Sequence, residues 1–199
     1  MSGRRVRGTG LKDKRFAVPR PNLGSAQVEW IKQQVAGYIS LQRETFRGRA
    51  IPLDARQRKA MQPFFPASNL DSVRVLVLQG ERVGNPAFYE QLVPMGFALA
   101  DLPNFSLMAA ITLVDTVVSH EKFTDRLLFR ELVHTVQYQK LGLEGFAAKY
   151  VDGFLTGDCY EAILLEKNAY ELDERFSAQP TRRFSVADEV QKWIDAGRF

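Results

Sequence analysis

The chain has 199 residues, of which 45% are hydrophobic and 25% are charged, a composition and length that suit a single globular domain. Its one cysteine, Cys159, excludes an intrachain disulfide, and no run approaches the ~18 apolar residues of a membrane span. The basic N-terminus has no apolar stretch behind it, so we expect no secretory signal and a cytoplasmic protein.

The positive charge is concentrated in residues 1–20, which hold seven Lys or Arg against Asp13 alone. That segment carries +6, whereas the other residues carry −2. A basic arm can contact phosphates or an acidic partner, but no RNA-binding signature accompanies it. We therefore expect a disordered basic arm over 1–20 that is dispensable for folding, followed by one domain over 21–199. Nucleic-acid or acidic-partner binding through the arm is an alternative.

The N-terminal part of the domain is predicted to contain two helices. Apolar residues recur at near-helical spacing from Val28 to Leu41, which predicts an amphipathic helix over 25–46. A short helix is predicted over 55–64, and Pro66 stops it.

Two strands are predicted to follow. Residues 72–83 alternate valines with other residues and end near Gly80, which is typical of a strand. Residues 86–92 are predicted to form a helical turn. Residues 109–119 are rich in β-branched side chains and predict a second, half-buried strand.

From Thr124 onward the pattern is helical, with helices predicted over 124–141, 144–155, 159–177 and 186–196. Gly142, Gly157 and Pro180 separate them. The order of a helix, then strands, then a mostly helical C-terminal half predicts an α+β fold and not a parallel α/β sheet.

The predicted helix over 124–141 carries apolar side chains on nearly every side, which is typical of a buried helix. Arg130, Glu131 and His134 lie within about one quarter-turn of one another on it. Charged groups on a buried helix need partners. These three titratable residues therefore indicate a site.

The predicted helix over 159–177 supplies a fourth charged residue. Glu166 projects from the middle of its apolar face, so we expect a buried carboxylate there. The other polar residues of this helix are expected on its solvent side: Glu161, Lys167, Asn168, Glu171 and Arg175.

The segments RELVHTVQYQKLG (130–142) and ILLEKNAYEL (163–172) resemble the zincin superfamily of zinc peptidases. Zincins carry His-Glu-x-x-His on one helix, and those with a glutamate as third ligand supply it from a later helix, often as Glu-x-x-Ala. The resemblance implies a zincin-like fold in which a small sheet packs against the site helix, with the strand over 109–119 as the edge strand of the substrate cleft. It places Glu131 at the general-base position, His134 at the second ligand and Glu166 at the third.

One position departs from the zincin pattern. Arg130 stands where the first histidine ligand belongs, and a guanidinium has no lone pair to give to a metal. The remaining pair, His134 and Glu166, falls short of the three protein ligands of a catalytic zinc site. His120 precedes the helix, and Cys159 lies about 10 Å along the helix axis from Glu166. We therefore expect no bound cofactor.

These observations favour a zincin-like protein that has lost zinc hydrolysis and acts as a binding or structural protein. Its remnant cleft could hold a peptide or protein partner by strand addition. The alternative is an active metallopeptidase with a non-standard ligand set, in which Glu131 would activate a zinc-bound water. A helical bundle with coincidental buried charges is a further alternative.

Three further side-chain roles are expected around this cluster. Arg130 is expected to replace the charge of the missing metal by pairing with Glu166. Tyr138 and Tyr170 each lie one turn beyond a site residue, and either hydrogen-bond into the site or pack in the core.

Overall fold

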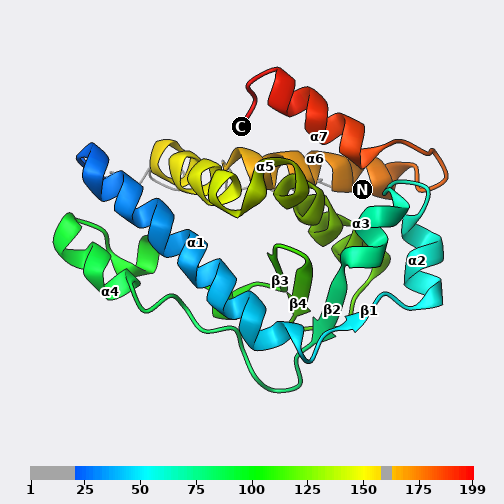
Figure 1. Cartoon of the computed structure of the whole chain (residues 1–199), viewed down its shortest axis with the longest axis horizontal. Helices are drawn as coiled ribbons and strands as arrows, with labels where there is room; N and C mark the ends of the chain where they lie inside the picture. Colours follow the sequence, from blue (N-terminus) through cyan, green and yellow to red (C-terminus); the bar gives the residue numbers. More distant parts are fainter. Residues whose placement is uncertain (1–20, 158–162) are drawn as a thin grey trace, which may run out of the picture.

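The computed structural model describes residues 21–157 and 163–199, and within them it has the predicted α+β architecture (Figure 1). The helices are α1 (Ser25–Arg47), α2 (Ala55–Met61), α3 (Ala67–Ser72), α4 (Tyr89–Leu92), α5 (Asp125–Thr156), α6 (Leu164–Ala178) and α7 (Val186–Asp195). The strands are β1 (Ile51–Pro52), β2 (Arg74–Val77), β3 (Ala110–Leu113) and β4 (Thr116–Ser119). Three short 3-10 turns (Val93–Met95, Leu99–Asp101 and Phe105–Leu107) connect α4 to β3.

The four described strands form a small mixed sheet in the order β1-β2-β4-β3. β2 and β4 are parallel, whereas β1 and β3 run antiparallel to their neighbours. β3 is thus an edge strand, and it packs against α5 and α1. This arrangement places the backbone of β3 beside the helix that carries the predicted site.

The prediction of one strand over 109–119 is wrong, because this segment is a β-hairpin. β3 and β4 pair from Ala110–Ser119 to Leu113–Thr116, and two residues, Val114 and Asp115, make the turn. Val114 has a φ of 63°, a conformation that usually falls to Gly or Asn. The Asp115 carboxylate accepts hydrogen bonds from Arg43 of α1, which holds the turn without a turn-forming sequence.

The helical predictions are largely confirmed. α1 spans the predicted 25–46 with one further residue, and the Thr124 side chain caps α5 by accepting from the Leu127 N–H. α5 is interrupted at Gly142, whose φ of 72° and ψ of 171° are not helical, as the predicted break requires. The first four residues of the predicted 159–177 helix, which include Cys159 and Glu161, lie outside the described residues, as does the basic arm over 1–20.

Three local predictions need correction. The strand predicted over 72–83 is confined to β2, and residues 67–72 before it form α3, which the sequence pattern did not indicate. β1 was also not predicted. Asn168, expected in solvent, is buried and donates to the Arg198 carbonyl, because the chain after α7 folds back over α6.

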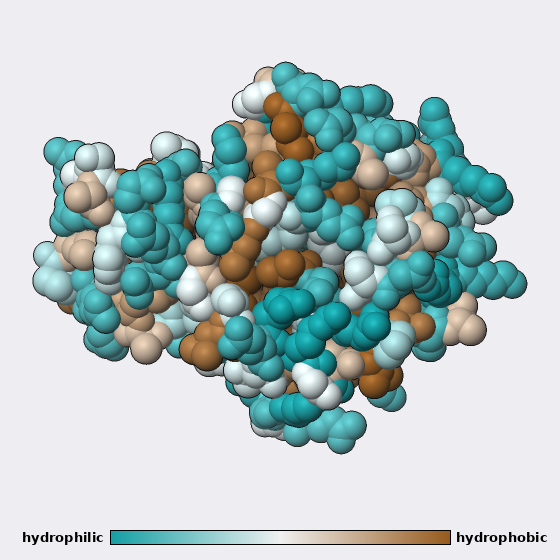
Figure 2. All heavy atoms as spheres, viewed as in Figure 1, coloured by the Kyte–Doolittle hydropathy of each residue, from teal (hydrophilic) through white to brown (hydrophobic). Residues whose placement is uncertain are grey.

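The core consists of two apolar clusters that meet along α5. One joins α1, the hairpin and the second part of α5; the other joins α2, the first part of α5, α6 and α7. Phe129 of α5 stacks on Phe176 of α6 with ring centroids 4.3 Å apart, so α5 and α6 are held by aromatic packing. Figure 2 shows hydrophobic side chains gathered near the centre of the viewed face, among polar and charged ones. In 21–157 and 163–199, no helix combines the length and the apolar character that a membrane crossing requires.

Candidate functional site

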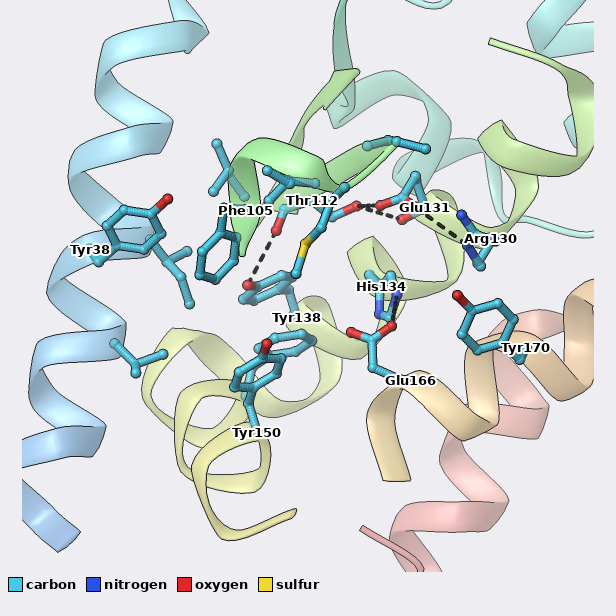
Figure 3. A pocket seen from close by; sticks show the side chains of 18 residues that line it. Tyr38, Phe105, Thr112, Arg130, Glu131, His134, Tyr138, Tyr150, Glu166 and Tyr170 are labelled. Carbon is cyan, nitrogen blue, oxygen red and sulfur yellow. Dashed lines mark hydrogen bonds and ion pairs between the residues drawn. The ribbon is translucent and has the colours of Figure 1, made fainter. Parts of the chain in front are cut away.

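A pocket of about 230 Å³ lies between α1, β3, α5 and α6. Its wall combines an apolar part, which includes Val35, Ile39, Met108 and Phe146, with a charged end. The structure brings all the sequence-predicted site residues into this lining: Arg130, Glu131, His134, Tyr138, Glu166 and Tyr170. Figure 3 shows them converging from α5 on one side and α6 on the other.

Arg130 is held at the charged end of the pocket by one ion pair and one aromatic ring. Its Nε lies 3.6 Å from Glu131 Oε1, and its guanidinium lies over the Tyr170 ring, 4.9 Å from the centroid. Burial alone would lower the pKa of Arg130, but the charge of Glu131 and more distant anions raise it. The guanidinium therefore stays charged.

Glu131 connects α5 to the edge strand. Its carboxylate accepts a hydrogen bond of 2.8 Å from the Thr112 hydroxyl, which also lies 3.1 Å from the Glu131 carbonyl oxygen. Burial raises the pKa of Glu131, against the opposing charges of His134 and Arg130. The carboxylate that the zincin resemblance assigns to the general-base position is thus already engaged by Thr112 and Arg130.

His134 and Glu166 form the second ion pair of the site, with His134 Nε2 3.5 Å from Glu166 Oε2. On its other side, His134 Nδ1 lies 2.8 Å from Gln137 Oε1, and the Gln137 amide nitrogen donates to the Leu165 carbonyl. Burial alone would lower the pKa of His134, but the charge and hydrogen bond of Glu166, the charge of Glu131 and the contact with Gln137 together outweigh it and raise that pKa to about 9. At neutral pH the imidazole is therefore a cation paired with a carboxylate.

The expected ion pair between Arg130 and Glu166 is wrong. Among the described residues, the ion pair of Glu166 within 4 Å is with His134 and that of Arg130 is with Glu131. The long Arg130 side chain lies over Tyr170, one turn of α6 beyond Glu166, which leaves the shorter imidazole beside the carboxylate. Glu166 still acts on Arg130 at longer range, since its charge contributes to the raised pKa of Arg130.

The two tyrosines have different roles. Tyr138 is buried, its hydroxyl donates to the Thr112 carbonyl at 3.4 Å, and its ring stacks on Phe146 with centroids 3.7 Å apart. It therefore both packs in the core and contacts the edge strand. Tyr170 supports the guanidinium of Arg130.

Sequence reasoning missed the role of Thr112, because nothing in a β-branched strand marks one threonine as the partner of a distant carboxylate. Gln137 had a usable signal, since it lies three residues after His134 and so on the same helix face. His120 does not join the site: its ring nitrogens contact the Met108 carbonyl and the Val83 N–H.

The donor set of the pocket does not fit a catalytic zinc site. His134 and Glu166 offer two ligands, and Arg130, which stands where the zincin pattern has its first histidine, offers none. Glu131 bonds to Thr112 and pairs with Arg130. Across the described parts of the chain, no group of three His, Cys, Asp or Glu side chains is arranged to hold a metal ion.

Comparisons of the chain with protein-family models, with curated proteins and with solved structures gave no match.

Proposed function

We propose that this protein is a zincin-like protein that has lost zinc hydrolysis and binds an extended peptide in its pocket. One observation carries the proposal. Arg130 takes the place of a metal ligand, and the four charged residues of the site are joined in two ion pairs. Each buried carboxylate thus has a cationic partner supplied by the protein itself, which is the electrostatic requirement that a metal would otherwise meet.

The edge strand supplies the peptide-binding groups. Ala109 and His120 form a hydrogen-bonded pair, because the His120 N–H donates to the Ala109 carbonyl. Pairs alternate along an antiparallel ladder, so Ala110 and Thr112 direct their backbone N–H and C=O groups away from β4. The contact of the Tyr138 hydroxyl with the Thr112 carbonyl agrees with this direction. An extended peptide can pair with such an edge as an additional strand.

The pocket sets the size of what the peptide inserts. Its volume of about 230 Å³ equals roughly eight water molecules at ~30 Å³ each. That space fits one large side chain. The apolar wall from α1 and β3 favours an aromatic or branched aliphatic residue at that position.

The loss of hydrolysis is tested by elemental analysis and a peptidase assay on protein purified without chelator and without added metal. We expect no stoichiometric zinc and no cleavage of a mixed peptide pool. One equivalent of zinc, lost together with peptidase activity in His134→Ala, would establish the alternative of an active metallopeptidase with Glu131 as general base.

Strand addition is tested by N-methylating the backbone of the peptide ligand, so that the protein itself is not altered. Each peptide of a phenylalanine-containing set is N-methylated at one residue in turn, and binding is measured by calorimetry. We expect methylation at alternate residues to abolish binding, because only every second N–H faces β3. Equal loss at every position, or none at any, would exclude pairing with the edge strand.

A further inference from the structure

Within the described residues the guanidinium of Arg130 makes no hydrogen bond, in contrast to the guanidinium groups of Arg43 and Arg126. Arg43 donates two hydrogen bonds to the Asp115 carboxylate, at 2.7 and 2.9 Å. Arg126 donates from Nε to both oxygens of Asp173. Arg130 makes no hydrogen bond to any residue in 21–157 or 163–199; its contacts there are the 3.6 Å ion pair with Glu131 and the stacking on Tyr170. Its planar fork therefore lines the pocket with free N–H groups.

The surrounding charges leave room for one more anion. Glu166 is balanced by His134, so it does not compete for Arg130 at contact distance. Glu131 takes a hydrogen bond from Thr112 and lies beyond hydrogen-bond distance from Arg130 Nε. A guanidinium has five donors, enough to keep the ion pair with Glu131 while binding both oxygens of a carboxylate. Stacking on Tyr170 fixes its plane, which reduces the entropy lost on binding.

The rest of the pocket selects what carries that anion. Away from the charged end, the wall is formed by apolar and aromatic side chains such as Val35, Ile39 and Phe105. Figure 3 shows the aromatic rings of Tyr138 and Tyr150 between this apolar wall and the charged cluster. A ligand that satisfies both ends has a compact apolar or aromatic body and a polar group at one end.

We propose that the pocket binds a carboxylate attached to an apolar or aromatic group, and that Arg130 is the residue that binds the carboxylate. This inference rests on the proposed function, because it assumes a pocket that holds a ligand and not a metal. Two sources share this chemistry: the C-terminal residue of a peptide and a free small carboxylic acid. A bidentate pair of a guanidinium and a carboxylate gives both its strength and its geometric specificity.

The test compares N-acetyl-L-phenylalanine with N-acetyl-L-phenylalanine amide by calorimetry. The two probes share the apolar body and differ in the charged oxygen. We expect the acid to bind at least about tenfold more tightly than the amide, as expected for charge-assisted hydrogen bonds. Arg130→Gln should abolish that preference while amide binding changes little, and Arg130→Lys should retain part of it because it keeps charge without the fork. Arg56→Gln, in an exposed ion pair on α2, is the matched control and should bind like the wild type.

The outcomes separate the two proposals. Equal binding of acid and amide by the wild type, or a preference that survives in Arg130→Gln, would overturn carboxylate recognition and leave peptide binding in place. If neither probe binds, carboxylate recognition is also overturned. The loss of hydrolysis is tested separately, by the zinc and peptidase measurements. A phenylalanine-terminated tetrapeptide that binds more tightly than 3-phenylpropionate identifies a peptide C-terminus as the source, and the reverse order identifies a free acid. Thermal melting of Arg130→Gln confirms that the variant is folded.

Discussion

Arg126 and Arg130 lie one turn apart on α5, and they are used in opposite ways. Arg126 Nε lies 3.0 and 2.8 Å from the two oxygens of Asp173, a carboxylate of α6 that is 0% exposed. Arg130 has a looser ion pair with Glu131 and stacks on Tyr170. The first arginine satisfies a buried charge and so holds two helices together. The second lines a pocket with its donors, and there we propose that it binds a ligand.

The largest expected effect follows from the buried partner of Arg126. Arg126→Met should lower the free energy of unfolding by about 3 kcal/mol, because Asp173 is left buried and unpaired. Arg130→Met should cost about 1 kcal/mol. Glu131 keeps its hydrogen bond from Thr112 in this variant, and the Arg130 side chain that is lost from the ion pair is partly exposed. Urea denaturation of both variants measures the difference. The double variant Arg126→Met with Asp173→Asn should recover part of the loss. Equal losses in Arg126→Met and Arg130→Met would contradict the different roles assigned to the two arginines.

Arg130→His should place a metal ligand on α5 where the wild type has a guanidinium. It would add a third donor to His134 and Glu166, which already lie 3.5 Å apart across α5 and α6. We expect zinc at about 100-fold above its Kd to raise the free energy of unfolding of this variant by about 2–3 kcal/mol. Thermal melting with and without zinc measures it. The wild type and Arg130→Gln are the controls, and a wild type stabilised as strongly as Arg130→His would contradict the two-ligand assignment.

Glu131 provides the next test, because it is the carboxylate that pairs with Arg130, as Asp173 is the carboxylate that pairs with Arg126. Thr112→Val removes the hydroxyl that donates to its carboxylate at 2.8 Å while keeping the shape of the side chain. We expect a loss of about 1.5 kcal/mol in urea denaturation, the usual size for a hydrogen bond to a charged group. Thr45→Val removes an exposed hydroxyl from α1 and should change stability by a few tenths at most. If Thr112→Val is equally neutral, Glu131 depends on Arg130 alone.

The contrast between these residues also shows what the sequence could provide. Helical periodicity predicted α1 and the burial of Glu166, because each depends on which face of one helix is apolar, and the glycine itself predicted the break at Gly142. Periodicity also placed Arg130, Glu131 and His134 close together on a buried helix, and the zincin resemblance predicted that Glu166 joins them. Position on a helix follows from spacing, so these features were accessible without a structure.

Partner choice was not accessible in the same way. Arg130 and His134 lie near each other on α5, and which of them meets Glu166 depends on side-chain length and on the ring of Tyr170. The hairpin escaped prediction because Val114 adopts a positive φ with no sequence signal. Asn168 is buried by a segment about 30 residues further along the chain. Each of these depends on tertiary contacts that local patterns do not encode.

A third pair, Arg43 with Asp115, lies between the two extremes and carries the smallest expected effect. Asp115 accepts two hydrogen bonds from Arg43, but its side chain is 22% exposed. Burial alone would raise the pKa of Asp115, yet the hydrogen bond and charge of Arg43, together with the charge of Arg47 at 3.2 Å, lower it below its ordinary value.

The sign of the pH dependence follows from that depressed pKa. The unfolded chain has a carboxyl pKa of about 3.9, so the pair contributes its full stability above that value and loses it as the pH falls through the folded-state pKa. We expect Asp115→Asn to cost about 1 kcal/mol at pH 7 and less at pH 2, because progressive protonation of the wild-type carboxyl weakens its attraction to Arg43. Urea denaturation of both proteins at the two pH values measures this. A difference as large at pH 2 as at pH 7 would mean that the aspartate holds the hairpin turn through its shape and not through its charge.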